Sequence, residues 1–210
     1  MLNRRNTMRL VFALFFAALL AGSAHALPGT PVLSGVKPFD HTYDGRILRG
    51  QIDYAVYEAY PGTVPGPGTY VYAYQIFNDA SSNVAIDSFS LSILEDAVVG
   101  DIGWDDFGVV DGIEPSHGYF SPDAATAQSA IYLFLPFMGG LIGADEYSVI
   151  MLFTSDNEPI ESFGILEGGS IGTMVEGLPT PVPEPATVFL LGIGALSLTG
   201  MGRRRRPRGF

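Results

Sequence analysis

Two alternating runs of residues, separated by a stretch of prolines and glycines, constrain the fold of this chain more than any other feature. Residues 51–59 (QIDYAVYEA) place isoleucine, tyrosine and valine on one side of an extended chain, and residues 70–77 (YVYAYQIF) alternate in the same way. The stretch between them, residues 61–68 (PGTVPGPG), is unsuited to a helix or a strand. The sequence therefore predicts a long-looped β-hairpin with aromatic pairs across its two strands.

Other segments up to residue 167 also read as short strands between turns. Residues 84–94 change the parity of their apolar positions near the middle, which indicates a β-bulge. Residues 147–153 (YSVIMLF) are apolar at nearly every position, as in a strand buried on both faces, and residues 162–166 form the last expected strand. These features predict an all-β domain, an antiparallel β-sandwich, over residues 27–167.

The first 26 residues have the three parts of a secretory signal peptide. Three arginines form the positive region, and residues 10–20 (LVFALFFAALL) form a helical apolar core. Ala24 and Ala26 form a small-x-small cleavage site, so Leu27 is the expected first residue of the mature protein. An uncleaved anchor is the alternative, although this apolar core is short for a membrane span.

The C-terminal end, residues 182–210, joins three physically different pieces. Residues 182–185 (VPEP) are locked by proline and carry one carboxylate. An uncharged apolar run, residues 186–202, follows, and as a helix of about 25 Å it predicts a transmembrane segment in a thin bilayer. The arginines of residues 203–210 predict that this end stays in the cytoplasm. The motif comprises Val182, Pro183, Glu184 and Pro185, and the basic tail contains Arg203, Arg204, Arg205, Arg206 and Arg208.

Residues 168–181 (GGSIGTMVEGLPTP) connect the predicted domain to the VPEP motif. Their glycine and proline content predicts a flexible linker with nothing to pack against. The expected organisation is therefore a signal peptide (1–26), a β-sandwich domain (27–167), a linker (168–181) and the C-terminal signal (182–210).

The charge of the exported part excludes one class of partner. The net charge of the chain is −11, but eight of its 11 basic residues lie in the two terminal segments. Of the 22 acidic residues, all but Glu184 lie between Leu27 and Pro181, which leaves that region with a net charge of about −18. Nucleic acid is therefore not an expected partner, because phosphate binding needs a basic surface.

The C-terminal features in this order, after a secretory signal, resemble the PEP-CTERM sorting signal of exported proteins in Gram-negative bacteria. The resemblance implies that the chain is a substrate of the membrane enzyme exosortase. It also implies that the tail holds a periplasmic domain at the inner membrane until it is cut near the motif, after which the protein reaches the cell surface or the exopolysaccharide matrix. The implied partners are exosortase, the secretion machinery, the inner membrane and exopolysaccharide. An unprocessed C-terminal anchor is the alternative.

No residue pattern points to catalysis. Residues 168–172 (GGSIG) match the nucleophile elbow of hydrolases, but that motif needs a helix after it and a later histidine, and no histidine follows Ser170. Ser116 and His117 are neighbours whose side chains point apart on an extended chain. We therefore expect no enzyme activity.

A glycine-rich acidic stretch is the one weak candidate for a metal site. Its carboxylates are of the type that calcium binds, although they lack the Asp-x-Asp-x-Asp-Gly order of a known calcium loop. The candidate ligands are Asp101, Asp105, Asp106 and Asp111. A solvated acidic loop is the alternative, and we expect no other cofactor. Two roles stay open for the domain, a non-catalytic surface or matrix component and a carbohydrate-binding module that uses calcium and exposed aromatic residues such as Trp104.

Overall fold

The computed structural model describes residues 27–94, 97–105 and 112–182 of the chain. Within these ranges the chain forms ten β-strands and no helix. The strands are β1 (Leu33–Tyr43), β2 (Arg46–Tyr57), β3 (Tyr70–Asn78), β4 (Ser88–Ser92), β5 (Val99–Asp105), β6 (His117–Ser121), β7 (Ser129–Leu133), β8 (Ile150–Ser155), β9 (Pro159–Gly168) and β10 (Ile171–Pro181).

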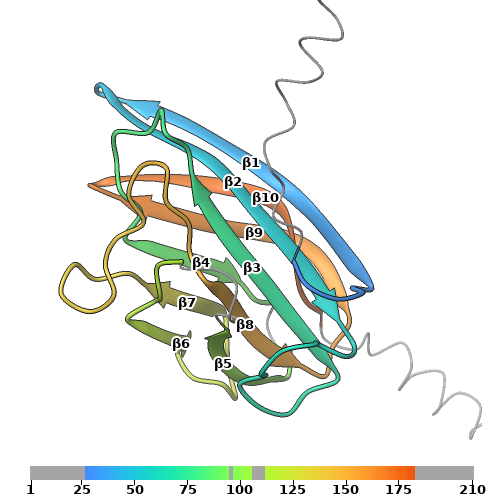
Figure 1. Cartoon of the computed structure of the whole chain (residues 1–210). Coiled ribbons are helices and arrows are strands. Elements are labelled where there is room, and N and C mark those ends of the chain that lie inside the picture. The colour runs from blue at the N-terminus through green and yellow to red at the C-terminus, as the bar shows by residue number, and fades with distance from the viewer. Residues whose placement is uncertain (1–26, 95–96, 106–111, 183–210) are drawn as a thin grey trace, which may run out of the picture.

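The strands form two five-stranded antiparallel sheets (Figure 1). The first sheet has the order β1-β2-β3-β8-β5, and the second has the order β10-β9-β4-β7-β6. The edge strands β1 and β10 lie side by side, and β5 and β6 lie side by side at the other edge. The predicted all-β architecture is confirmed for the described residues. The predicted signal-peptide and transmembrane helices lie outside them.

The predicted long-looped hairpin is formed by β2 and β3. The two strands are antiparallel, and Tyr54 lies opposite Tyr74 in their register. One face of the pair, including Ile52, Tyr72 and Tyr74, lies in the main hydrophobic core between the two sheets. The alternation in the sequence therefore predicted the two strands, their pairing and the residues that share a face.

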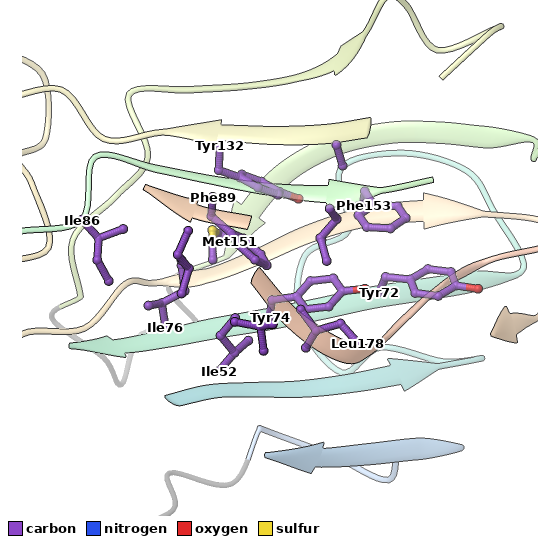
Figure 2. Close-up of a cluster of buried hydrophobic side chains, with 14 of the residues drawn as sticks. Ile52, Tyr72, Tyr74, Ile76, Ile86, Phe89, Tyr132, Met151, Phe153 and Leu178 are labelled. Atoms are coloured by element: carbon purple, nitrogen blue, oxygen red, sulfur yellow. The ribbon is translucent and has the colours of Figure 1, made fainter. Parts of the chain in front are cut away.

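Aromatic rings at the centre of the core join the two sheets (Figure 2). Phe153 of β8 stacks on Tyr72 with the ring centroids 4.9 Å apart and the planes 4° from parallel. It also meets Phe120 of the second sheet edge-to-face at 6.0 Å. The hydroxyl of Tyr132 donates to the carbonyl of Leu152 at 2.7 Å, so this buried polar group is satisfied.

Strand β8 is buried on both faces, as its apolar run predicted. One face belongs to the main core, and the outer face belongs to a second apolar cluster with Tyr57 and the half-buried Leu27 and Tyr60. The loop between β2 and β3 covers the same side of the sheet, since Pro65 packs over Gly103 of β5. Because this loop covers the outer face of the sheet, β8 is buried and apolar on both faces although it lies next to the edge strand β5.

The parity change predicted within residues 84–94 is present. Val84 and Ile86 are buried on one parity, and Phe89 of β4 is buried on the other. Glu167 of β9 is the register partner of Ser88, and its carbonyl also accepts the amide of Asp87 at 2.9 Å. Asp87 and Ser88 thus both lie opposite Glu167 of the neighbouring strand, which is the arrangement of a β-bulge.

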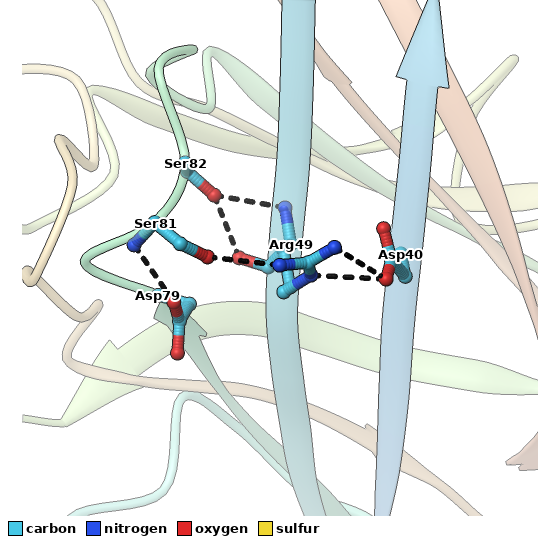
Figure 3. Close-up of polar contacts among 5 residues, drawn as sticks. All are labelled: Asp40, Arg49, Asp79, Ser81 and Ser82. Atoms are coloured by element: carbon cyan, nitrogen blue, oxygen red, sulfur yellow. Dashed lines mark hydrogen bonds and ion pairs between the residues drawn. The ribbon is translucent and has the colours of Figure 1, made fainter.

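Arg49 ties three segments together at the end where β1 turns into β2 (Figure 3). Its guanidinium forms an ion pair with Asp40 of β1 at 2.8 Å and donates to Ser81 at 3.2 Å. Its backbone exchanges two hydrogen bonds with the Ser82 hydroxyl, each 2.8 Å. Both charged groups are about half exposed, so the ion pair contributes at most about 1 kcal/mol, and its main effect is to place the turn that follows β3.

The predicted linker over residues 168–181 is wrong, because most of it is strand β10. The turn between β9 and β10 has Gly169 and Ser170 at φ of 53° and 72°, the left-handed conformation of a two-residue hairpin turn. Strand β10 then buries Ile171, Val175 and Leu178 in the main core. Glycine and proline are tolerated here because β10 is an edge strand, so one side of its backbone needs no partner in the sheet.

Buried tyrosines predict a sharp loss of stability in alkali. Burial raises the pKa of Tyr57 to about 12, and it also raises the pKa of Tyr74 and Tyr132 well above the usual value. Unfolded tyrosine titrates near pH 10, so the stability contributed by these neutral hydroxyls is complete below pH 10 and falls above it. Each such tyrosine lowers the free energy of unfolding by about 1.4 kcal/mol per pH unit between its pKa in the unfolded chain and its pKa in the folded chain.

We therefore expect one cooperative unfolding transition above pH 10, with tyrosinate absorbance rising as circular dichroism is lost. Most tyrosines titrating near pH 10 with an unchanged dichroism spectrum would contradict the burial.

Candidate functional site

The most informative site is the point where the chain leaves the sandwich, because the VPEP motif begins there. Strand β10 ends at Pro181, which is paired with Pro159 at the start of β9. Thr180 has no exposed surface, and Pro179 and Pro181 are also buried. The last residues before the motif are therefore part of the packed domain.

Two contacts anchor this exit. The Tyr74 hydroxyl, which comes from the centre of the first sheet, donates to the carbonyl of Pro179. The amide of Val182, the first residue of the motif, donates to the carbonyl of Glu158 at 3.0 Å. The folded structure thus reaches into the motif, and the remaining motif and tail residues lie outside the described part. Those residues are Pro183, Glu184, Pro185, Arg203, Arg204, Arg205, Arg206 and Arg208.

A bulge within β10 sets which side chains face the core before the exit. The register shifts between Glu176 and Leu178, and Gly177 has a φ of 73°. Val175 before the bulge and Leu178 after it have opposite parity, yet both are buried. The Lys37 ammonium of β1 lies beside Gly177, where a side chain would meet it. The exit therefore depends on a glycine that both tolerates positive φ and makes room for the neighbouring strand.

Leu27, the predicted first residue of the mature chain, lies near the same end of the sandwich. The amide of Val32 donates to the carbonyl of Val56 at 2.8 Å, and Leu27 packs against the outer apolar cluster with Tyr60. The predicted cleavage residues Ala24 and Ala26 lie outside the described part. Both segments expected to meet the membrane therefore attach on the side where β2 ends and β3 begins.

The acidic stretch predicted to be a loop is partly strand β5, and this corrects the proposed calcium geometry. Asp101 and Asp105 both lie on β5, paired with β8. Asp105 is buried and accepts the amide of Thr63 at 3.2 Å, and its carboxylate adds to burial in raising the pKa of Tyr60. Asp106 and Asp111 lie outside the described part. Across the residues that the structure places, no three His, Cys, Asp or Glu side chains gather as metal ligands would.

The serine and histidine candidates occupy structural positions. Ser170 lies in the tight β9–β10 turn rather than between a strand and a helix. The Ser116 hydroxyl accepts the amide of Leu135 at 3.0 Å and donates to the carbonyl of Met138, while His117 is exposed at the start of β6. These contacts hold the turn of residues 135–140.

That turn displays a feature that no sequence pattern marked. Phe137 is 96% exposed at its tip, next to the exposed Met138. The amides of Met138 and Gly140 both donate to the carbonyl of Leu135, so the tip is a compact hairpin turn. In the sequence, residues 131–137 read as an ordinary apolar strand, and only the two glycines that follow signal a turn.

Comparison with known proteins identifies the C-terminal end. No helix in the described ranges is long and apolar enough to cross a membrane. No curated protein and no solved structure matches the chain. The family model of the PEP-CTERM protein-sorting motif matches residues 181–206, beginning at the last residue of β10. The chain therefore carries the PEP-CTERM motif of exported proteins that are held at the membrane by their C-terminal end and sorted by exosortase.

Proposed function

We propose that the chain is the membrane-held precursor of a non-catalytic surface or exopolysaccharide-matrix protein. In this proposal the β-sandwich faces the periplasm, residues 186–202 span the inner membrane, and exosortase cuts near the VPEP motif. The observation that supports it most is that the described strands and their core are complete by Val182, the first residue of the motif. A cut after this residue leaves the ten strands of the described residues and their core intact, so the product keeps the folded sandwich.

The composition of that product is compatible with an extracellular location. Its net charge of about −18 keeps copies apart and soluble in a polymer matrix. The chain has no cysteine, so no disulfide stabilises the domain. Aromatic rings in the core join the two sheets instead. An acidic sandwich without cysteine fits a structural component better than a labile signalling domain.

A carbohydrate-binding module is the second candidate. Trp104 of β5 and Tyr119 of β6 are both more than one-third exposed on neighbouring edge strands, where aromatic rings can stack on sugars. Calcium would act through the carboxylates near β5. Glycan-array binding that is lost with Trp104→Ala or with a chelator would favour this role over a purely structural one.

Cell fractionation tests the sorting part of the proposal. In cells that contain exosortase, we expect the domain in the extracellular or matrix fraction. In cells that lack exosortase, we expect it in the membrane fraction, because the apolar run has not been removed. A domain that stays in the membrane fraction of both strains would indicate an ordinary anchor and contradict the proposal.

A further inference from the structure

The end of the sandwich from which the chain leaves has a surface that differs from an ordinary acidic face. We call this end the base, and define it by residues 32–33, residues 94 and 97–98, residues 156–160 and residues 179–182. Residues 156–160 adjoin residues 179–182 through the register of β9 with β10, and residues 97–98 through the hydrogen bond from Val98 to Asn157. Residues 32–33 lie at the same end, because the registers of β1 with β2, β2 with β3 and β3 with β8 place the start of β1 level with the end of β8. These segments lie far apart in the sequence and meet only in the folded domain.

Exposed apolar side chains gather at the base. Val98 is 58% exposed and Val32 is 53% exposed, and three more large apolar residues are exposed beside them. The five side chains are Val32, Leu33, Leu94, Val98 and Ile160.

Backbone contacts hold these apolar side chains in place. The amide of Val98 donates to the Asn157 side chain at 2.6 Å, and its carbonyl accepts the Ser155 hydroxyl at 2.5 Å. Val32 is held by its hydrogen bond to Val56, and Ile160 lies in the β9–β10 ladder opposite Thr180. The base thus presents a fixed apolar surface rather than loose loop residues.

Chain length places this surface close to the apolar run. Four residue steps separate Val182, the last described residue, from Ala186, where the run begins. Even fully extended, these steps span at most about 14 Å. If residues 168–181 were a flexible linker, the domain could lie far from the bilayer. Because most of them form strand β10, only the short segment after Val182 separates the domain from the apolar run.

From these observations, and resting on the proposed function, we infer that the base of the sandwich contacts the lipid bilayer surface while the tail is uncut. The occupant is the interfacial region of the lipid, where apolar side chains are buried beside headgroups. The contact is apolar rather than electrostatic, because the exposed charged groups at and beside the base are acidic. They are Glu58, Asp156, Glu158 and Glu161. Anionic lipid therefore weakens the contact.

Single-cysteine labelling of the full chain tests this contact, since the natural sequence has no cysteine. The variants are Val98→Cys at the base and Tyr43→Cys at the opposite end, both exposed positions whose change leaves the core intact. Each carries a fluorophore, and the purified full chain is placed in phosphatidylcholine nanodiscs with a quencher near the headgroups. We expect several-fold stronger quenching at position 98 than at position 43. Equal quenching would overturn the inference.

A lengthened chain separates true contact from simple tethering. An insertion of about 20 Gly and Ser residues between Val182 and Pro183 gives a flexible reach of roughly 25 Å. If the base itself binds lipid, position 98 stays more strongly quenched than position 43 in this longer chain. Replacing Val32 and Ile160 with serine then removes the difference, whereas Phe137→Ser at the far end does not. Equal quenching of the two positions in the longer chain would overturn the inference.

Lipid charge supplies a further readout. Phosphatidylglycerol in the nanodiscs is expected to reduce quenching at position 98, and stronger quenching would contradict an apolar contact. These measurements use no exosortase, so a failure of processing in cells and a failure of lipid contact are distinguishable.

Discussion

Ending the chain at Gly168 instead of Val182 is expected to abolish folding of the sandwich. The truncation removes β10, which buries Ile171, Val175 and Leu178 in the main core. Burying each of these side chains is worth about 1.5–3 kcal/mol, so their loss is comparable to the whole stability of a small domain, about 5–15 kcal/mol. It also leaves the Tyr74 hydroxyl without the carbonyl that accepts its hydrogen bond.

Circular dichroism and thermal unfolding of two chains measure this effect. A chain of residues 27–182 serves as the control and is expected to show a β-sheet spectrum and one cooperative transition. A chain of residues 27–168 is expected to show neither. If residues 169–182 were a linker, the two chains would unfold at the same temperature, and that result would contradict the role of β10.

Replacing Phe153 with alanine is expected to destabilise the domain by about 3–5 kcal/mol. The ring is fully buried, stacks on Tyr72 and meets Phe120 of the opposite sheet, so its removal leaves a cavity where the sheets join. At about 2–4 °C per kcal/mol for a domain of this size, the melting temperature falls by roughly 10 °C.

The same substitution at Phe137 is the matched control. This ring is 96% exposed, so Phe137→Ala removes an equal number of atoms without opening a cavity. Its effect on the free energy of unfolding is expected within about 0.5 kcal/mol. Similar losses at the two positions, measured by urea unfolding, would show that the core is not centred on Phe153.

Strands with a regular alternation could be predicted from the sequence, as could the bulge within residues 84–94, whereas strand β10 with its bulge could not. The runs that became β2 and β3 keep one parity throughout, so the residues that share a face were visible in the sequence. Strand β10 changes parity at Gly177, so Val175 and Leu178 lie three residues apart and match no strand period. Its prolines are permitted only because it is an edge strand, and the sequence does not reveal which strand lies at an edge.

For the candidate site, the motif could be recognised in the sequence, but its position relative to the domain could not be predicted. Recognition of VPEP needs only neighbouring residues, whereas the anchoring of Val182 to Glu158 depends on how β9 and β10 pair. Asp101 and Asp105 were read as loop residues because Gly100 and Gly103 interrupt β5. Both glycines instead make room for the proline-rich loop that covers this strand.

The most direct test of the sorting account is the intact mass of the mature protein from cells with and without exosortase. With exosortase, we predict a chain that begins at Leu27 and ends near the VPEP motif, and without it a chain that still ends at Phe210. Glu184→Ala is expected to give the longer mass in both strains, while Glu176→Ala, an exposed glutamate of β10, is processed normally. A chain that ends at Phe210 in the presence of exosortase would contradict the account.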